Sequence, residues 1–344
     1  MVGTTQHEVD VELNPEDGFS DALYANNFSL FRRGRTPGHR KSANRYGALK
    51  KNMKRILITG ATGNIGHEVI RYLYDNNTTN QIIAGVRNII KAKSEFKDYT
   101  QLNYVQFDFE DSATFDNSLD NIDCIFLLRP PNISDIDKYF APLIKMIKEK
   151  EITQVVFLSV QGAEKSKVIP HNKIEKLITD YGLDFIFLRP SYFMQNLTTT
   201  LLKDILEKHK IILPAGKAKF NWIDIENIGE VTAKLLCDFD SYKNRVIELT
   251  GYENKDFYEV TDMINDSIST KIKFDNSNPF RFYWIKKNDG LNAGMIIVMM
   301  VLHFLPRFQP KPKISNFYEQ LTGKKPTTLK DFITRENYKL TPIK

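Results

Sequence analysis

Short apolar runs alternate with amphipathic segments from about residue 54 to residue 190. The apolar runs have the length of buried strands, and the segments between them space their apolar residues three and four apart, as helices do. The predicted strands lie within 54–60, 81–88, 102–111, 122–131, 154–160 and 183–191, and the predicted helices are 64–75, 140–150 and 171–182. This order indicates an α/β fold with a Rossmann-like, doubly wound parallel sheet covered on both faces.

The alternation weakens beyond about residue 190, which predicts a smaller C-terminal α/β lobe interleaved with the end of the main sheet. Residues 1–52 differ from the rest because they show no sustained apolar period. Their first 31 residues carry six acidic side chains and no Lys or Arg, and residues 32–52 carry eight basic ones. We interpret 1–52 as a disordered or tag-like extension, with an arm for nucleic acid or a membrane as the alternative.

Composition is that of a globular protein, with 344 residues of which 42% are hydrophobic and 26% charged. The formal charge of +6 is small for this size and does not predict nucleic-acid binding. Cys124 and Cys237 lie in apolar runs, which predicts reduced core thiols and no metal site. With no signal-peptide pattern, we expect a cytoplasmic protein. The apolar run 294–306 is shorter than the roughly 20 residues of a membrane span, and predicts a buried or partner-contacting helix.

The sequence "TGATGNIG" joins the first predicted strand to the first predicted helix through Gly60, Gly63 and Gly66. Glycines let the backbone turn tightly and approach a pyrophosphate, and the start of a helix offers free N–H groups. The candidate cofactor-binding residues of this turn are Thr59, Gly60, Thr62, Gly63, Asn64, Ile65 and Gly66. We therefore expect residues 53–190 to form an NAD(P)-binding core and residues 191–344 to form a substrate lobe.

Arg87 follows the second predicted strand, where a site that prefers NAD carries a carboxylate for the ribose hydroxyl. A guanidinium pairs well with the 2′-phosphate of NADP instead. The sequence thus predicts NADP(H), with NAD(H) disfavoured. Asp108, just past the third predicted strand, is positioned for the adenine amino group or for a helix N-cap.

Several segments, taken in order, resemble the NmrA-like atypical short-chain dehydrogenases. They are "ITGATGNIG", "FDFED", "LSVQGAEKSKVIPHNKIEKLI", "LDFIFLRPSYFMQNL", "WIDIENIGEV" and "LTGKKPTTLKDFI", and the resemblance covers about residues 54 to 335. That family includes NADPH-dependent quinone and dye reductases, and members that sense the NADP redox state without turnover. The resemblance implies further cofactor contacts from Asp108, Phe109, Leu127, Leu128, Arg129 and Pro190, and a substrate wall of Tyr192, Phe193 and Met194. Arg129 departs from the small residues usual in the family there, and a phosphate or the substrate is its alternative ligand.

The catalytic positions of the typical enzymes hold different residues here. Those enzymes use a Ser after the fifth strand and a Tyr-x-x-x-Lys pair on the next helix. This chain has Ser159, then His171 and Glu175. Positions four apart share a helix face, and a carboxylate beside an imidazole favours its protonated form, so His171 is a candidate proton donor. Contact without proton transfer and a purely structural role remain the alternatives.

Two Tyr-x-x-x-Lys matches occur elsewhere, at Tyr46–Lys50 and Tyr283–Lys287, and we interpret both as chance. Without the tyrosine, an acceptor that is already electrophilic is favoured over an unactivated ketone. We expect an NADPH-dependent reductase of a quinone-like or other electrophilic small molecule. The alternative is an NADP(H)-sensing regulator without turnover that acts through a protein partner; a sugar-nucleotide epimerase is disfavoured. No metal, nucleic acid or membrane span is predicted, and a homo-oligomer is left open.

Overall fold

A computed structural model describes residues 53–76, 78–165, 167 and 169–341. The predicted extension 1–52 lies outside the described residues, as does Tyr46–Lys50. Within the described part, no helix is long and apolar enough to cross a membrane.

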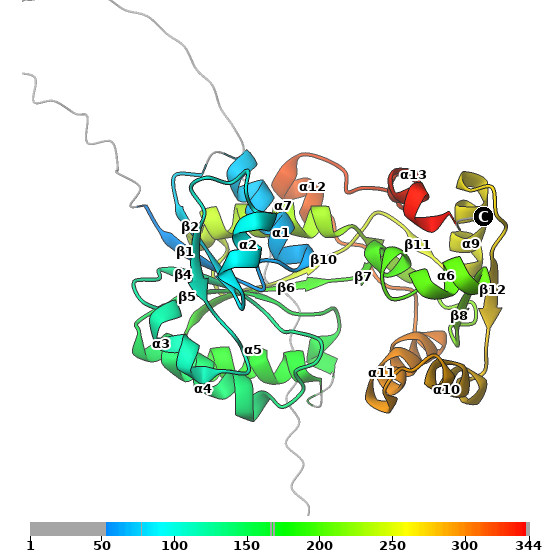
Figure 1. Ribbon diagram of the computed structural model, residues 1–344, viewed down its shortest axis with the longest axis horizontal. Coiled ribbons are helices and arrows are strands. Elements are labelled where there is room, and N and C mark those ends of the chain that lie inside the picture. The colour runs from blue at the N-terminus through cyan, green and yellow to red at the C-terminus, as the bar shows by residue number, and fades with distance from the viewer. Residues whose placement is uncertain (1–52, 77, 166, 168, 342–344) are drawn as a thin grey trace, which may run out of the picture. The chain divides into compact units, whose positions relative to one another are not determined.

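Seven parallel strands form the central sheet, in the order β10-β6-β5-β4-β1-β2-β3 (Figure 1). Their bounds are β1 Arg55–Thr59, β2 Gln81–Val86, β3 Asn103–Gln106, β4 Cys124–Leu128, β5 Gln154–Leu158, β6 Asp184–Pro190 and β10 Arg245–Leu249. The chain enters at β1, moves outward to β3, and returns to β4 on the other side of β1. The reversal between β1 and β4 is the switch point where such sheets bind ligands, at the carboxyl ends of the strands. The Rossmann-like, doubly wound fold is confirmed.

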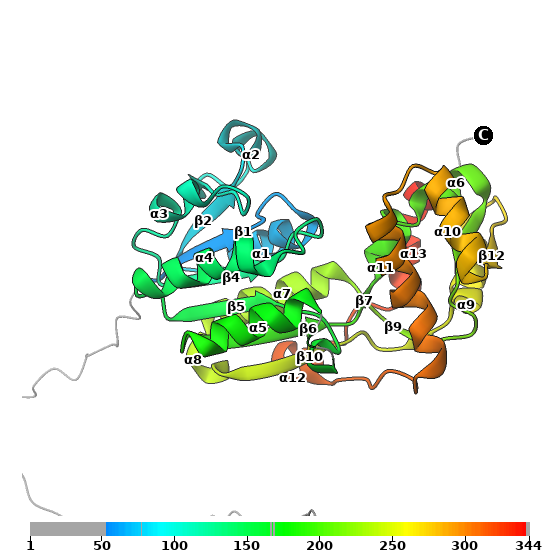
Figure 2. The ribbon, with the colours of Figure 1, turned by 90° about the horizontal axis from the view of Figure 1, so that it is seen from below.

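Helices cover both faces of this sheet (Figures 1 and 2). On β1, Ile56 and Ile58 contribute to one buried core and Leu57 to the other, because successive side chains of a strand point to opposite faces. The first layer contains α1 Asn64–Asp75, α2 Ile89–Glu95, α7 Ile225–Cys237, α8 Phe239–Tyr242 and α12 Phe317–Thr322. The second contains α3 Phe115–Ser118, α4 Ile136–Glu149 and α5 Pro170–Asp180, with the short turns η1 Ser112–Thr114 and η2 Ala163–Lys165.

The C-terminal part of the chain returns to the main sheet through β10 and α7. Helix α7 packs along α1 so closely that a Cβ at Gly229 would lie 2.6 Å from the Cβ of Glu68. Only glycine permits this approach, so α7 fixes the helix that begins at the glycine turn.

The other C-terminal elements surround a second core of their own. Strands β7 Tyr192–Phe193, β9 Phe220–Ile223 and β11 Asn254–Lys255 form one small sheet, and β8 Lys210–Leu213 pairs with β12 Lys273–Asn276. The helices are α6 Leu202–Lys208, α9 Phe257–Ser267, α10 Pro279–Asn288, α11 Ala293–Phe304 and α13 Leu329–Leu340, with the turns η3 Met194–Thr198 and η4 Leu305–Phe308. Trp222, Phe257 and Phe282 are fully buried in this core.

Among the helices before residue 190, α2 and α3 were not predicted, and α4 starts earlier than expected. Helix α4 begins at Ile136, four residues before the predicted start, because the side chain of Asp135 caps it by accepting from the Lys138 N–H. Helix α2, which the pattern did not predict, is capped in the same way by Asn88. A capping side chain can start a helix at residues that precede its first regularly spaced apolar positions.

Candidate functional site

The glycine turn lies at the carboxyl end of β1, at the switch point of the sheet. The fully buried Thr59 hydroxyl donates to the carbonyl oxygen of Phe126 at 2.9 Å and accepts from the N–H of Leu128 at 3.3 Å. These bonds join the end of β1 to β4 and fix the position from which the turn leaves the sheet.

The three predicted glycines each meet a steric requirement of the turn. Gly60 has φ of +61°, in the left-handed region that disfavours side chains. A Cβ at Gly66 would lie 2.3 Å from the carbonyl oxygen of Gly60, and one at Gly63 would lie 3.1 Å from it. Gly63 is the N-cap of α1 and supplies no side-chain cap. The first-turn N–H groups of α1, which include those of Asn64 and Ile65, therefore have no side-chain cap, and the exposed Thr62 lies on the same turn.

Arg87 lies beside this turn because β1 and β2 are neighbours, with Thr59 opposite Gly85. Its side chain is exposed, and it makes no ion pair within 4.0 Å to any residue that the structure describes. The helix that follows it is anchored to α1 by stacking of His67 on Phe96, at 5.1 Å between ring centres. A guanidinium without an ion-pair partner among the described residues therefore lies at the neighbouring strand end.

The residues after β3 have separate environments. The Asp108 carboxylate accepts from the N–H of Glu110 at 3.0 Å, while the N-cap of η1 is Asp111. The N-cap alternative for Asp108 is therefore wrong, because Asp111 occupies that position. Phe109 is buried and stacks on Phe140 at 5.2 Å, so its ring belongs to the core.

The segment after β4 brings one apolar side chain to the turn and one cation near it. Leu127 is fully buried, whereas Leu128 is half-buried and packs beside Gly60. Arg129 donates from Nη1 to the carbonyl oxygens of Pro130 and Ile133, and its buried Nε has no hydrogen-bond partner among the residues that the structure describes. Burial lowers the pKa of Arg129.

Glu175 does not pair with His171 as the sequence suggested. Its carboxylate accepts from Nε and Nη2 of Arg189, at 2.9 and 2.7 Å, and from the Ser159 hydroxyl at 2.6 Å. All three side chains are buried. Arg189 also donates from Nη1 to the Glu164 carboxylate at 2.6 Å. Ser159 and Glu175 therefore form a buried polar network that links β5, α5 and β6.

The pKa of His171 is shifted down, whereas the expected pairing with Glu175 would shift it up. Its pKa is lowered to about 3, by burial and by the positive charge of Arg129. Its ring lies 6.0 Å from that of Phe157. The interpretation of His171 as a protonated acid near neutral pH is wrong, because Glu175 faces Arg189 and the charge near the imidazole is positive. Its neutral ring is still available for contact without proton transfer.

Pro190, predicted as a cofactor contact, and the predicted substrate wall after it are divided between two cores. Pro190 is buried at the end of β6, Phe193 packs against the main core, and Met194 is fully buried in the C-terminal core. The Tyr192 hydroxyl lies 2.9 Å from Nε2 of His303, and burial raises the pKa of Tyr192. Met194 thus packs inside the protein, and Tyr192 already has a hydrogen-bond partner.

Arg189, the partner of Glu175, is not among the residues predicted from the sequence. The available signal was a basic residue inside the apolar run "LDFIFLRPS", since a charge in such a run requires a counter-charge. Tyr283 and Lys287 lie on α10 in the C-terminal lobe, outside the strand-five-to-six interval.

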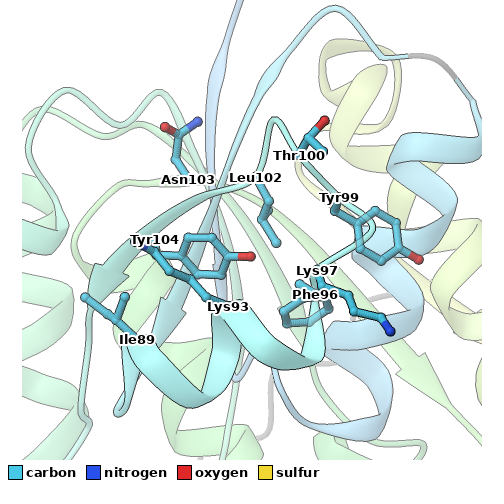
Figure 3. Close-up of a pocket in the computed structure, with 9 residues that line it drawn as sticks. All are labelled: Ile89, Lys93, Phe96, Lys97, Tyr99, Thr100, Leu102, Asn103 and Tyr104. Carbon is cyan, nitrogen blue, oxygen red and sulfur yellow. The ribbon is translucent and has the colours of Figure 1, made fainter.

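A hollow of about 560 Å³ lies between α2 and residues 99–104, the segment that leads into β3 (Figure 3). Its lining comes from α2, from the connection 96–102 and from the amino end of β3, whereas the glycine turn is at a carboxyl end. We do not assign it to the cofactor. In the described residues, no three His, Cys, Asp or Glu side chains are grouped to hold a metal ion. Cys124 and Cys237 are free thiols, and burial raises the pKa of Cys124 to about 12.

The model of the NmrA-like family matches residues 52–284. The chain belongs to the NmrA-like family. A relative in this comparison is prestalk A differentiation protein A of Dictyostelium discoideum, 28% identical over 277 residues, which are 80% of this chain and 90% of that protein. An NAD(P)H azoreductase of Xenophilus azovorans is 24% identical over 64% of this chain and 76% of its own length.

Solved structures with this fold include two nucleotide complexes. The NADPH-dependent quinone oxidoreductase of Escherichia coli, complexed with NADPH, matches with a TM-score of 0.73 and 22% identity, over 81% of this chain and 99% of that one. The triphenylmethane reductase of Citrobacter, complexed with NADP(H), matches with a TM-score of 0.71 and 19% identity, over 82% and 99%. At these identities the likeness shows the shared fold.

Proposed function

We propose that this NmrA-like protein is an NADPH-dependent reductase of quinone-like or other electrophilic small molecules. The observation that carries the proposal is the glycine turn at the switch point, with an exposed Arg87 beside it. Relatives named as NAD(P)H azoreductase and NADPH-dependent quinone oxidoreductase support it.

The chain's residues fit a dinucleotide. The absence of a Cβ at Gly66 lets α1 pack directly against the Gly60 carbonyl oxygen and keeps the turn tight, and the first N–H groups of α1 provide hydrogen bonds and a positive dipole end for a pyrophosphate. Arg87 would hold the 2′-phosphate, because it is a cation without an ion-pair partner in the described residues. When bound, NADPH supplies a hydride; the residues below determine which acceptors can use it.

The side chains that could donate a proton near the proposed site favour an electrophilic acceptor. His171 is neutral at pH 7, since its pKa is about 3. The Ser159 hydroxyl is committed to Glu175, and the Tyr192 hydroxyl to His303. None of these groups is a strong acid aimed at a substrate, so the product must take its proton from water. Quinones and cationic dyes tolerate this, because they accept hydride before protonation is needed.

The regulator without turnover stays the alternative, since the same turn would serve a sensor. Full-length protein incubated with NADPH and a panel of quinones and dyes separates the two by the loss of NADPH absorbance. Turnover that disappears in Gly66→Ala supports the reductase. Tight NADPH binding by calorimetry with no turnover on any acceptor favours the sensor. Absence of NADPH binding contradicts both.

A further inference from the structure

Helix α11 packs into the C-terminal lobe through one face only. Its buried residues are Ile296, Met299 and His303, and the imidazole of His303 is held by Tyr192 and by the carbonyl oxygen of Met299, at 2.9 and 2.6 Å. These bonds fix the rotation of the helix about its own axis. The opposite face is therefore presented to solvent as a constant surface.

That opposite face is apolar throughout. No residue from Ala293 to Phe304 is acidic or is Lys or Arg. The outer face comprises Met295, Ile297, Val298, Val301, Leu302 and Leu305, each 41 to 57% exposed, followed by Phe308 at 74%. Their spacing of three and four residues places them along one side of the helix. Such a run of exposed large apolar side chains marks a binding surface.

The neighbouring helix α10 also carries exposed apolar side chains. The two helices lie side by side in the C-terminal lobe (Figure 2). On α10, Phe280 and Trp284 are 84% and 63% exposed. We call Phe280, Trp284 and the exposed residues of α11 and η4 the apolar surface.

Positive charge accompanies the apolar surface. From Gly290 to Tyr318 the sequence contains Arg307, Lys311 and Lys313 and no acidic residue. Arg307 and Lys311 line a hollow of about 510 Å³ beside η4, together with Lys217 and Lys219. Lys219 is paired with Asp256 and Glu259, but the other three cations of this basic hollow make no ion pair within 4.0 Å among the described residues.

We propose that the apolar surface and the basic hollow together dock onto an anionic phospholipid bilayer. An interfacial helix buries its apolar face at the acyl boundary, and adjacent basic side chains bind the anionic headgroups. A second copy of this chain is a poorer occupant. In a two-fold dimer the surface would meet itself, which brings the cations of the basic hollow toward like charges.

This inference goes beyond the proposed reductase, and its test needs neither cofactor nor acceptor. Full-length protein is sedimented with vesicles of phosphatidylcholine alone and of phosphatidylcholine mixed with phosphatidylserine. We expect binding to the mixed vesicles that weakens as salt is raised. Lys311→Ala should weaken it about fivefold, the worth of one basic residue at such a surface. The double substitution Val298→Glu with Leu302→Glu should abolish it.

The matched control is Ile90→Glu, which changes an apolar residue that is 85% exposed on α2, away from the apolar surface. It should bind vesicles as the parent does. The parent also carries an internal probe, because Trp284 is one of two tryptophans and the other, Trp222, is fully buried. Tryptophan emission should shift to the blue on anionic vesicles.

Three outcomes would overturn the proposal. One is equal binding to both vesicle types or to neither. Another is emission that stays unchanged at saturating anionic vesicles. The third is a parent dimer, seen by sedimentation velocity, that the double substitution converts to monomer, since the apolar surface would then join two copies of the chain.

Discussion

Lowering the pH from 7 to 5 should destabilise the folded protein through His171. The imidazole has a pKa of about 3 in the folded chain, against about 6.5 for an ordinary histidine. Between these values the unfolded chain binds a proton that the folded chain does not, so the free energy of unfolding falls as the pH falls through this window. At pH 5 the unfolded state gains about 2 kcal/mol from this proton, and at pH 7 only about 0.2 kcal/mol.

Urea unfolding at pH 7 and pH 5 measures this difference. Other groups titrate in the same interval, including His303, whose pKa burial lowers to about 4. The parent is therefore compared with His171→Gln, which lacks only this imidazole. We expect the parent to lose about 2 kcal/mol more than His171→Gln between the two pH values. The control His209→Asn changes an exposed histidine with φ of +51°, a conformation that Asn tolerates, and should keep the pH dependence of the parent.

Equal losses in the parent and in His171→Gln would refute the reasoning. They would mean that the folded protein accommodates a protonated His171, which would restore it as a proton donor. The predicted result has a consequence for catalysis: the rate with a quinone should show no titration of His171 between pH 5 and pH 8, because this group stays neutral there.

Three further results are expected. Gly66→Ala should lower the free energy of unfolding by about 1–3 kcal/mol and abolish NADPH binding, because its Cβ would lie 2.3 Å from the carbonyl oxygen of Gly60. The control is Gly294→Ala, whose Cβ meets nothing closer than 3.5 Å. Urea unfolding and calorimetry with NADPH compare the two variants. Arg87→Ser should weaken NADPH binding about tenfold or more and leave NADH affinity unchanged, and equal losses for both would contradict the 2′-phosphate contact. Glu175→Gln should lower the free energy of unfolding in urea by about 3 kcal/mol, because the buried charge of Arg189 loses its carboxylate partner. Adding Arg189→Met should restore part of this stability. If Glu175→Gln is as stable as the parent, the ion pair does not stabilise the fold.

The local parts of this protein could be predicted from the sequence with few errors. The strands followed from apolar runs, and the glycine turn followed from its position between a strand and a helix, because both depend on neighbouring residues. The start of α4 and the whole of α2 were missed, since each depends on one capping side chain, Asp135 or Asn88. The spacing of apolar residues does not reveal a single capping hydrogen bond.

Tertiary structure alone decided the chemistry of α5. In sequence, Glu175 is one helical turn from His171, and that proximity suggested an ion pair. In the fold, β6 brings Arg189 to Glu175, and the segment after β4 brings Arg129 toward His171. Electrostatic energy depends on distance in space and on exclusion of water, and neither is encoded by spacing along one helix. The sequence by itself therefore determined the glycine turn between the first strand and the first helix, and the packing of remote strands decided which groups near α5 are charged.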